Sequence, residues 1–268
     1  MNKIKIDAYS LLEKIRADKP VVHHLTNWVT IYDCANIVKV LGGSPVMAHA
    51  KEEVAEMASI ASGLVLNIGT LTPEFVAAMK VAAKSANKKG IPVILDACGA
   101  GATRLRDKKV LELINETRIN IIKGNASEIA RVSGERVKTK GVDTGHVARN
   151  LMEIARNLAR KRKCTVVVTG REDIVTDGKK LYLIKNGHPM MTYVVGTGCM
   201  AASIIGAFIA VEHDLAYAAA GGLICFEIAA ECAARKSKGP GTFKEQMFDC
   251  LHNLDKKTID LMQRAECY

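Results

Sequence analysis

The chain has 268 residues, of which 49% are hydrophobic and 25% charged, a composition typical of a soluble globular protein. No apolar run approaches the roughly 20 residues of a membrane span, and the N-terminal stretch MNKIKIDAYS lacks the apolar core of a secretory signal, so we expect a cytoplasmic protein without membrane contact. The formal net charge of +10 comes from dispersed lysines and arginines, which are densest at 160–163 and have no interleaved aromatic residues. This distribution favours attraction of an anionic small molecule such as a nucleotide over binding of nucleic acid.

Apolar runs of strand length alternate with helical periods from the N-terminus to about residue 170. We predict strands at 21–25, 44–47, 64–68, 92–95 and 119–122, and helices at 7–18, 29–41, 51–61, 72–90, 107–116 and 127–132. Thr72 is expected to cap its helix and Pro73 to occupy the first turn. An exposed polar loop is predicted at 133–142, followed by a helix at 144–161.

Three further strand-like runs follow at 164–169, 172–176 and 180–185, and the turn residues between them indicate hairpins. From Cys199 onward the pattern is helical, with predicted breaks near Gly221–Gly222 and at 239–241. Because β-rich apolar strands alternate with helices, we predict an α/β fold with three α/β/α layers and a mostly parallel central sheet. No linker or repeat interrupts residues 1–268, so a single domain is expected.

Polar and glycine-rich residues follow the predicted strands, at the edge where ligands bind in parallel α/β folds. They are Asn27, Met47, 67–69, 96–101, 123–125 and 169–170. Met47, the apolar exception, suits either the flat face of an uncharged ring or the core. Asp96 precedes a glycine loop and could hold magnesium near phosphates. Glu128 is a second candidate, which would otherwise complement a helix dipole.

Lys123 lies near the end of the run NIIKGN, where it could meet a nucleotide phosphate or be an exposed loop lysine. The loop GAGAT at 99–103 matches neither a Walker loop nor G-x-G-x-x-G. The sequence therefore lacks the motif of a dinucleotide-binding fold. His23 and His24 have no serine or cysteine partner motif and are interpreted as structural. The eight cysteines are scattered, so neither a disulfide framework nor a zinc site is expected.

The stretch VVGTGCMAASII at 194–205 has the pattern of a glycine turn that opens a buried helix. The N–H groups at such a turn have no partner within the helix, and they suit a phosphate or a developing oxyanion. Alternatively, Gly196 and Gly198 permit close helix packing.

Taken together, these segments resemble hydroxyethylthiazole kinase, a family of the ribokinase-like superfamily. The resemblance covers nearly the whole chain and rests on HHLTNWVT (23–30), GGSPVMAHAKEE (42–53), LNIGTL (66–71), ILDACGAGAT (94–103), NIIKGNASEIA (120–130), VVVTGREDIVTDG (166–178) and VGTGCMAAS (195–203). It implies phosphorylation of the hydroxyl of 4-methyl-5-(2-hydroxyethyl)thiazole with ATP and Mg²⁺, a salvage step towards thiamine. The nearest alternative is another ribokinase-like small-alcohol kinase, acting on a pyrimidine or vitamin, or an ATP-dependent dehydratase. In those relatives the late glycine loop generally ends in aspartate, where this chain has Cys199.

The resemblance also implies site roles by motif. Substrate contacts are implied for Asn27, Met47 and Gly196. Nucleotide contacts are implied for Lys123, Thr169 and the amides at Gly198. Asp96 and Glu128 are implied to bind magnesium, directly or through water. Cys199 stands where most ribokinase relatives carry an aspartate proposed as general base. A homotrimer with sites between subunits is implied as well, in which Asn27 and Met47 could serve a neighbour's site.

Two departures from the family pattern bear on the chemistry. Ala97 and Cys98 replace proline and valine in the loop before GAGAT, and Lys123 stands where arginine is frequent, which keeps the charge but loses the bidentate fork. A helix N-terminus lowers the pKa of a thiol, whereas the negative charge of ATP opposes a thiolate. We therefore hypothesise that Cys199 assists the reaction while the amides of GTGC supply most of the stabilisation.

Overall fold

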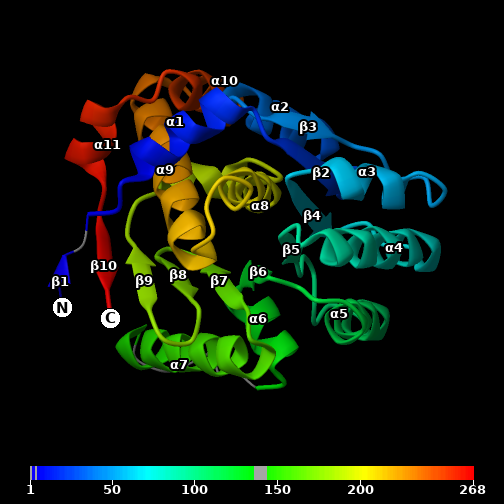
Figure 1. The fold of residues 1–268 in the computed structure, drawn as a ribbon. Helices are drawn as coiled ribbons and strands as arrows, with labels where there is room; N and C mark the ends of the chain where they lie inside the picture. Colours follow the sequence, from blue (N-terminus) through cyan, green and yellow to red (C-terminus); the bar gives the residue numbers. More distant parts are fainter. Residues whose placement is uncertain (1, 4, 136–143) are drawn as a thin grey trace.

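The structure of the protein, a computed structural model, describes residues 2–3, 5–135 and 144–268, so most of the loop predicted at 133–142 lies outside the described residues. The ten strands of the described chain form one sheet in the order β1-β10-β9-β8-β7-β6-β5-β4-β2-β3 (Figure 1). The strands are β1 (Asn2–Lys3), β2 (Val21–Leu25), β3 (Ser44–Val46), β4 (Gly63–Asn67), β5 (Val93–Asp96), β6 (Ile121–Asn125), β7 (Thr165–Thr169), β8 (Asp173–Thr176), β9 (Leu181–Ile184) and β10 (Ala265–Cys267).

Helices connect these strands along most of the chain. They are α1 (Ala8–Asp18), α2 (Ile31–Leu41), α3 (Val54–Ile60), α4 (Pro73–Lys89), α5 (Arg104–Glu116), α6 (Ala126–Ser133), α7 (Thr144–Arg162), α8 (Thr197–Phe208), α9 (Leu215–Lys236), α10 (Pro240–His252) and α11 (Lys256–Met262), with a short 3-10 helix at Pro189–Tyr193. At α4 the predicted cap is confirmed, since Oγ1 of Thr72 accepts a hydrogen bond from the Phe75 N–H at 3.1 Å and Pro73 begins the helix.

The half of the sheet from β7 to the edge strand β3 is parallel, and the other half is antiparallel. Strands β3, β2, β4, β5, β6 and β7 pair in parallel, whereas β8, β9, β10 and β1 pair antiparallel. The mostly parallel sheet and the hairpins predicted between 164 and 185 are therefore confirmed.

Helices cover both faces of the sheet, because successive strand residues point to opposite sides. In β5, Ile94 packs into a buried cluster with residues of α1, α2, α8, α9 and α10, whereas Val93 and Leu95 pack with residues of α3, α4, α5, α6 and α7. Figure 1 shows the two groups of helices on either side of the strands. The predicted three-layer arrangement is confirmed.

Helix α9 corrects the prediction of a break at Gly221–Gly222, since it runs unbroken through both glycines. A Cβ atom on Gly221 would lie 2.9 Å from Cδ1 of Leu11, and one on Gly222 would lie 3.2 Å from Cδ2 of Phe208, so the glycines serve close packing. Among the described helices, α9 alone is long and apolar enough to cross a membrane, but 78% of its apolar window is buried inside the fold. It is the core helix of the domain.

The chain end also differs from the helical prediction. After α11 the chain turns back as β10, which pairs with β9 and extends the sheet. The break predicted at 239–241 is confirmed by the start of α10 at Pro240.

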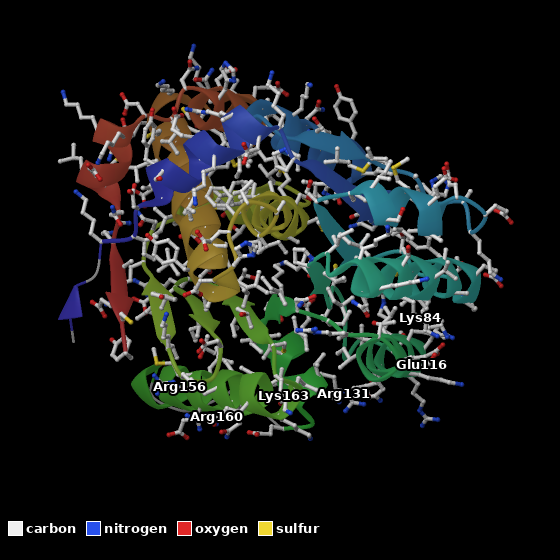
Figure 2. The ribbon with its side chains drawn as sticks, in the orientation of Figure 1. Lys84, Glu116, Arg131, Arg156, Arg160 and Lys163 are labelled. Carbon is white, nitrogen blue, oxygen red and sulfur yellow. The ribbon has the colours of Figure 1, made fainter. Side chains whose placement is uncertain are left out.

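The densest basic run, 160–163, lies at the C-terminal end of α7, where Arg160 and Lys163 lie at the surface (Figure 2). Nε of Arg160 donates to the carbonyl of Gly178 at 2.7 Å, and Nη1 of Arg162 donates to Oδ1 of Asn115 at 2.7 Å. These cations complement the negative end of a helix dipole and bind neighbouring segments of the same chain.

Candidate active site

Three polar side chains form a row across the carboxyl ends of three neighbouring parallel strands. The strand register pairs Asn67 of β4 with Asp96 of β5, and Asp96 with Lys123 of β6. Residues paired in register project to the same face of a sheet. All three are buried, with exposed fractions of 1%, 1% and 3% in that order. The sheet itself therefore fixes this row, which we call the Asn67–Asp96–Lys123 row, at the ligand-binding edge.

Lys123 and Asp96 form a buried ion pair within the row. Nζ of Lys123 lies 3.2 Å from Oδ2 and 3.3 Å from Oδ1 of Asp96, and Nδ2 of Asn67 donates to Oδ2 at 2.9 Å. Burial raises the pKa of Asp96 to about 7, although the charge of Lys123 acts in the opposite direction. Burial also lowers the pKa of Lys123, but the negative charges around it, Asp96 first, outweigh burial and the net shift is upward. The ammonium therefore stays charged.

This geometry decides between the two alternatives for Lys123. Strand β6 extends to Asn125, beyond the end predicted at residue 122, and the exposed-loop alternative is wrong. Lysine, glycine and asparagine are atypical of strands, yet backbone pairing with β7 keeps all three in the sheet. The ammonium lies in the row, where an anionic ligand could reach it.

Cys199 joins the row from the N-terminal end of α8. Its Sγ accepts hydrogen bonds from Nδ2 of Asn27 at 3.2 Å and from Nδ2 of Asn67 at 3.4 Å. Nδ2 of Asn27 also approaches Oδ1 of Asn67 at 3.1 Å. Asn27, which could have served a neighbouring subunit, therefore lies in the cluster of its own chain.

Hydrogen bonding lowers the pKa of the Cys199 thiol to about 5. The neighbouring thiol of Cys98 contributes most, burial opposes the shift, and the hydroxyl of Thr30 and the charge of Lys123 act in the same direction as Cys98. The same contact, together with burial, raises the pKa of Cys98. Cys98 therefore remains the donor of the pair, and the sulfur of Cys199 can carry negative charge.

Two glycines shape the turn before α8. Gly196 has a φ of 92°, and a Cβ atom there would lie 2.4 Å from Cγ2 of Thr30. A Cβ atom on Gly198 would lie 3.2 Å from Nζ of Lys123. The N–H groups of the first helical turn have no partner within the helix and carry the positive end of its dipole. Close packing and anion binding are therefore compatible at this turn.

Glu128 is the acid of a capping box at the start of α6. Its Oε2 accepts a hydrogen bond from the N–H of Asn125 at 2.7 Å, and its Oε1 accepts one from the N–H of Gly99 at 2.7 Å. Its charge also acts on Asp96, so the two carboxyl groups are neighbours. Glu128 thus anchors the glycine loop to α6 and retains lone pairs for water.

A cavity of about 990 Å³ opens beside the row. Thr169 at the end of β7 and Gly198 of α8, next to Lys123, line one part of it. Residues of β8 and α9 and of the segment 185–192 line much of the rest. The structure therefore brings Thr169 and Gly198, both expected to contact nucleotide, into one cavity. Its volume falls within the range of small-molecule and cofactor sites.

Met47 and the two histidines do not join the row. Met47 follows β3 and is half-buried, and within the described residues it packs with neither hydrophobic core cluster, which disfavours the core alternative. Nε2 of His23 lies 2.7 Å from the carbonyl oxygen of Ala48, and Nδ1 of His24 lies 3.0 Å from that of Val22. Both rings are buried and bonded to backbone, as the structural interpretation requires.

Sequence reasoning missed three contributors to the site. Asn67 was noted only as a polar strand end, yet it donates to both Asp96 and Cys199. Cys98 was noted only as a departure from the family loop, and Thr30 was not singled out. The position of Asn67 directly after a buried strand was the available signal; the contacts of Cys98 and Thr30 depend on packing between distant segments.

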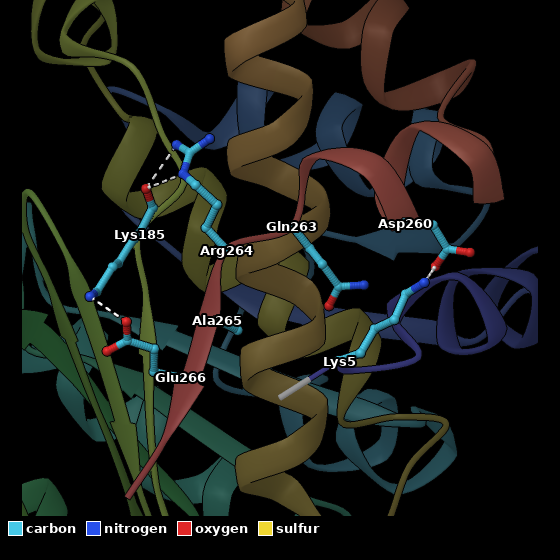
Figure 3. A pocket seen from close by; sticks show the side chains of 7 residues that line it. All are labelled: Lys5, Lys185, Asp260, Gln263, Arg264, Ala265 and Glu266. Atoms are coloured by element: carbon cyan, nitrogen blue, oxygen red, sulfur yellow. Dashed lines mark hydrogen bonds and ion pairs between the residues drawn. The ribbon is translucent and has the colours of Figure 1, made fainter. Parts of the chain in front are cut away.

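A second cavity, of about 380 Å³, lies beside β10 at the other side of the sheet (Figure 3). The cations that line it are all paired: Lys5 with Asp260 at 3.1 Å, Lys185 with Glu266 at 2.6 Å and Arg264 with Glu231 at 2.7 Å. Its charges therefore serve the structure, and the large cavity is the candidate ligand site.

Comparisons with known proteins agree with the fold and identify the family. A model of the hydroxyethylthiazole kinase family matches residues 12–257. A hydroxyethylthiazole kinase of Methanosarcina mazei is 50% identical over 255 residues, which cover 95% of this chain and 98% of that protein. The solved structure of a hydroxyethylthiazole kinase protein from Pyrococcus horikoshii OT3 is 36% identical, has a TM-score of 0.90 and covers 97% of this chain and 98% of its own. The fold is shared by a ribokinase-like superfamily protein from Enterococcus faecalis V583. That protein is 14% identical to this chain, with a TM-score of 0.64, and the match covers 94% of this chain and 98% of that protein. The chain belongs to the hydroxyethylthiazole kinase family.

Proposed function

We propose that this chain transfers the γ-phosphoryl group of ATP to the hydroxyl of 4-methyl-5-(2-hydroxyethyl)thiazole, a salvage step towards thiamine. The observation that carries the proposal is that the Asn67–Asp96–Lys123 row and Cys199 meet at the start of α8, where Gly198, next to Lys123, lines a large cavity. Phosphoryl transfer needs positioning and charge stabilisation more than a strong base. This end of the cavity offers both.

The phosphates of ATP would lie against Lys123 and the N–H groups around Gly198, with Thr169 beside them. A lysine ammonium and a helix N-terminus both attract phosphate. Lys123 is already paired with Asp96, so the bound triphosphate adds negative charge that one ammonium does not balance. A further cation is therefore required at this end.

Mg²⁺ suits this end because it is bound by one or two carboxylates together with substrate phosphates and waters, rather than by an all-protein cage. Within the described residues there is no group of three or more metal-binding side chains, and Asp96 with Glu128 supplies two carboxylates. Asp96 would hold the ion, and Glu128, whose oxygens accept backbone N–H groups, would act through water. The ion neutralises charge on the transferring phosphoryl group.

The thiazole alcohol would contact Asn27, Met47 and Gly196, with its hydroxyl towards Cys199. As the alcohol oxygen bonds to phosphorus and the bond from phosphorus to the ADP oxygen breaks, the hydroxyl proton passes to Sγ of Cys199 or to solvent. The lowered thiol pKa of about 5 leaves the sulfur a weak base. Cys199 therefore assists, and the N–H groups of the first turn of α8 stabilise the transferring group.

We also propose a single cytoplasmic domain that assembles as a homotrimer with sites between subunits. Exposed apolar side chains flank the contact between Thr30 and Gly196: Val29, Tyr32, Tyr193 and Val195 are 69%, 76%, 74% and 72% exposed. Gathered apolar side chains of this kind mark protein contacts. Light scattering should give the mass of three chains, and Val195→Lys should reduce it; a wild-type monomer at enzyme concentrations used for assay would contradict the trimer.

The experiment that tests the function is a coupled assay of ADP release over a panel of small alcohols, with the product identified by mass. The thiazole alcohol should give the highest kcat/KM and a product heavier by one phosphoryl group. Activity with a hydroxymethylpyrimidine and none with the thiazole would replace this proposal with its nearest alternative. Asp96→Ala is the matched negative control for contaminating kinases.

A further inference from the structure

A buried pair of carboxyl groups lies at the other end of the large cavity. Asp173 belongs to β8 and is 3% exposed, and Glu227 belongs to α9 and is 6% exposed; both line the cavity. Strand β8 lies two strand spacings from β6, the strand of Lys123, which is about 10 Å. The cavity therefore extends from the start of α8, next to Lys123, to this carboxyl pair.

The two carboxyl groups are neighbours, and a hydrogen bond between them, which requires a shared proton, is among the causes of their pKa shifts. Oδ1 of Asp173 also accepts a hydrogen bond from the N–H of Gly170 at 2.9 Å. Burial raises the pKa of Glu227 well above its usual range, and the nearby charge of Asp173 raises it further. The proton therefore stays on Glu227, and the pair carries one negative charge rather than two.

One oxygen of this pair has no donor from the protein. Oε2 of Glu227 is buried, and no N–H or hydroxyl group of the described residues donates to it. Its neighbour Glu231, one helical turn away, accepts hydrogen bonds from Asn186, Gly187 and Arg264. A buried acceptor without a donor is costly, and at the wall of a cavity a ligand can supply the donor.

The walls around Glu227 suit a flat aromatic base. The cavity is lined by Leu223 and Phe226 of α9, Ala201 of α8, and Pro189 and Met191 of the 3-10 helix. These side chains give it apolar surfaces. Binding sites of this kind combine mostly apolar walls with a few polar groups that fix orientation. The carboxyl pair disfavours a phosphate in direct contact with it, whereas Lys123 and the start of α8 attract one, so a nucleotide enters with its phosphates towards Lys123.

We infer that Glu227, held by Asp173, recognises the base of the phosphate donor by accepting a hydrogen bond from its exocyclic amine. A 6-aminopurine supplies that donor, whereas a 6-oxopurine presents an acceptor to the same oxygen and leaves it unpaired. The inference rests on the proposed nucleotide site in this cavity, and it adds a preference for adenine over hypoxanthine.

The test measures nucleotide binding without the alcohol substrate, by titration calorimetry with ADP and IDP. The wild-type protein should bind ADP at least about tenfold more tightly, the ratio that one net hydrogen bond supplies. Glu227→Gln keeps an acceptor oxygen and can donate to Asp173 in place of the shared proton, so it should keep the preference. Glu227→Leu should reduce the ratio to about two or less, while Glu116→Leu on the exposed face of α5 (Figure 2) should leave it unchanged.

The remaining outcomes separate this inference from the proposed function. Equal binding of ADP and IDP by the wild type, or an unchanged ratio in Glu227→Leu, overturns the inference alone. Binding of neither nucleotide overturns the nucleotide site and the inference with it. If IDP binds as tightly as ADP while 2′-deoxy-ADP binds more weakly, the Glu227 oxygen accepts a hydrogen bond from the ribose hydroxyl instead, and the inference is wrong.

A second measurement covers the case in which Glu227→Leu does not fold. Infrared difference spectra of the wild type should show a protonated carboxyl C=O band that shifts on binding ADP and does not shift on binding IDP. Glu227→Gln should remove the band. The same shift with both nucleotides contradicts recognition of the exocyclic amine.

Discussion

The ammonium of Lys123 lies 3.2 Å from Oδ2 of Asp96, with both side chains buried beneath the start of α8. Two ions have lost their solvation here, and each depends on the other for compensation. The pair therefore links the stability of the sheet to the chemistry of the site, and the consequences of breaking it can be measured separately.

Removing one partner should destabilise the fold, and removing both should restore much of the loss. Lys123→Met leaves Asp96 without its counter-ion in the interior, and above about pH 7, where the wild-type carboxyl is ionised, we expect a loss of about 3–5 kcal/mol in the free energy of unfolding. The double variant Lys123→Met/Asp96→Asn contains no buried ion and should recover more than half of that loss. Urea unfolding of the wild type, of Lys123→Met, of Asp96→Asn and of the double variant gives the coupling energy between the two residues. If the losses of the two single variants add up to that of the double variant, the pair contributes nothing.

The stability of the wild type should depend on pH through Asp96. Its pKa is raised to about 7 in the fold, above the value of the unfolded chain, so the folded state binds the proton more tightly. Relative to Asp96→Asn, the wild type should therefore lose stability as the pH rises from about 4 to about 7, by up to about 1.4 kcal/mol per unit. Urea unfolding of both proteins across this range measures the difference, and parallel curves would contradict the assignment.

Asp96 and Lys123 should differ in their contributions to turnover. Asp96→Ala removes the proposed direct ligand of Mg²⁺ and should lower kcat by at least about 10³-fold, comparable to the loss of an electrostatic group in other transfer reactions. Lys123→Ala should mainly raise the KM for ATP, with a smaller loss in kcat, because the N–H groups of α8 remain. Rates are compared at a temperature where circular dichroism shows both variants folded. Similar losses of kcat would undermine the assigned roles.

Cys199 should tolerate replacement by the residue usual among ribokinase relatives. Cys199→Asp should keep or raise kcat, because the proton acceptor is retained and the backbone N–H groups are unchanged. Complete loss of activity in the folded variant would count against an assisting role.

The neighbouring thiol offers a separate measurement. Cys98→Val removes the thiol that contributes most to the lowered pKa of Cys199. The pH midpoint for alkylation of Cys199 by iodoacetamide should therefore rise above about 5, the value expected for the wild type. Cys250→Val is the control, since Cys250 lies on α10 away from the row. An unchanged midpoint would show that Cys98 does not donate to Cys199.

Gly196 should accept no side chain. Gly196→Ala forces a positive φ of 92° on alanine and a Cβ within 2.4 Å of the Thr30 methyl, so we expect a loss of about 1–3 kcal/mol in stability and a higher KM for the thiazole alcohol. Thr30→Ser removes that methyl and keeps the hydroxyl. In the Thr30→Ser background the loss should be smaller, because the closest contact is gone and only the backbone strain and the 3.0 Å approach to Cβ of residue 30 remain; an equal loss would exclude the contact with the methyl group.

The sequence predicts the parallel half of the fold well, because its strands are apolar runs bounded by glycine, proline or polar residues. Strand β2 and the start of α4 at Pro73 match the prediction. Strands β1 and β10 are not predicted, since they are short, mixed in polarity and defined by pairing with distant residues. The end of β6 is not predicted for a related reason, because Lys123 is in a strand only through its pairing with β7.

The site is predictable to the extent that its residues follow strands or glycine turns. Asp96, Lys123 and Cys199 were singled out on that basis, and the structure brings them together. The contact between Cys98 and Cys199 depends on how α8 packs over a loop, and the pair of Asp173 with Glu227 joins a strand to a helix about fifty residues later. Neither has a local signature in the chain.

The register that aligns Asn67, Asp96 and Lys123 has a consequence for how this enzyme can diverge. These residues are held by backbone pairing between neighbouring strands, so a change in one cannot be absorbed by a loop moving. Asn27 and Gly196 lie instead on connections between elements. Selection for a different alcohol can therefore act on the connections while the strands inherit the transfer chemistry intact.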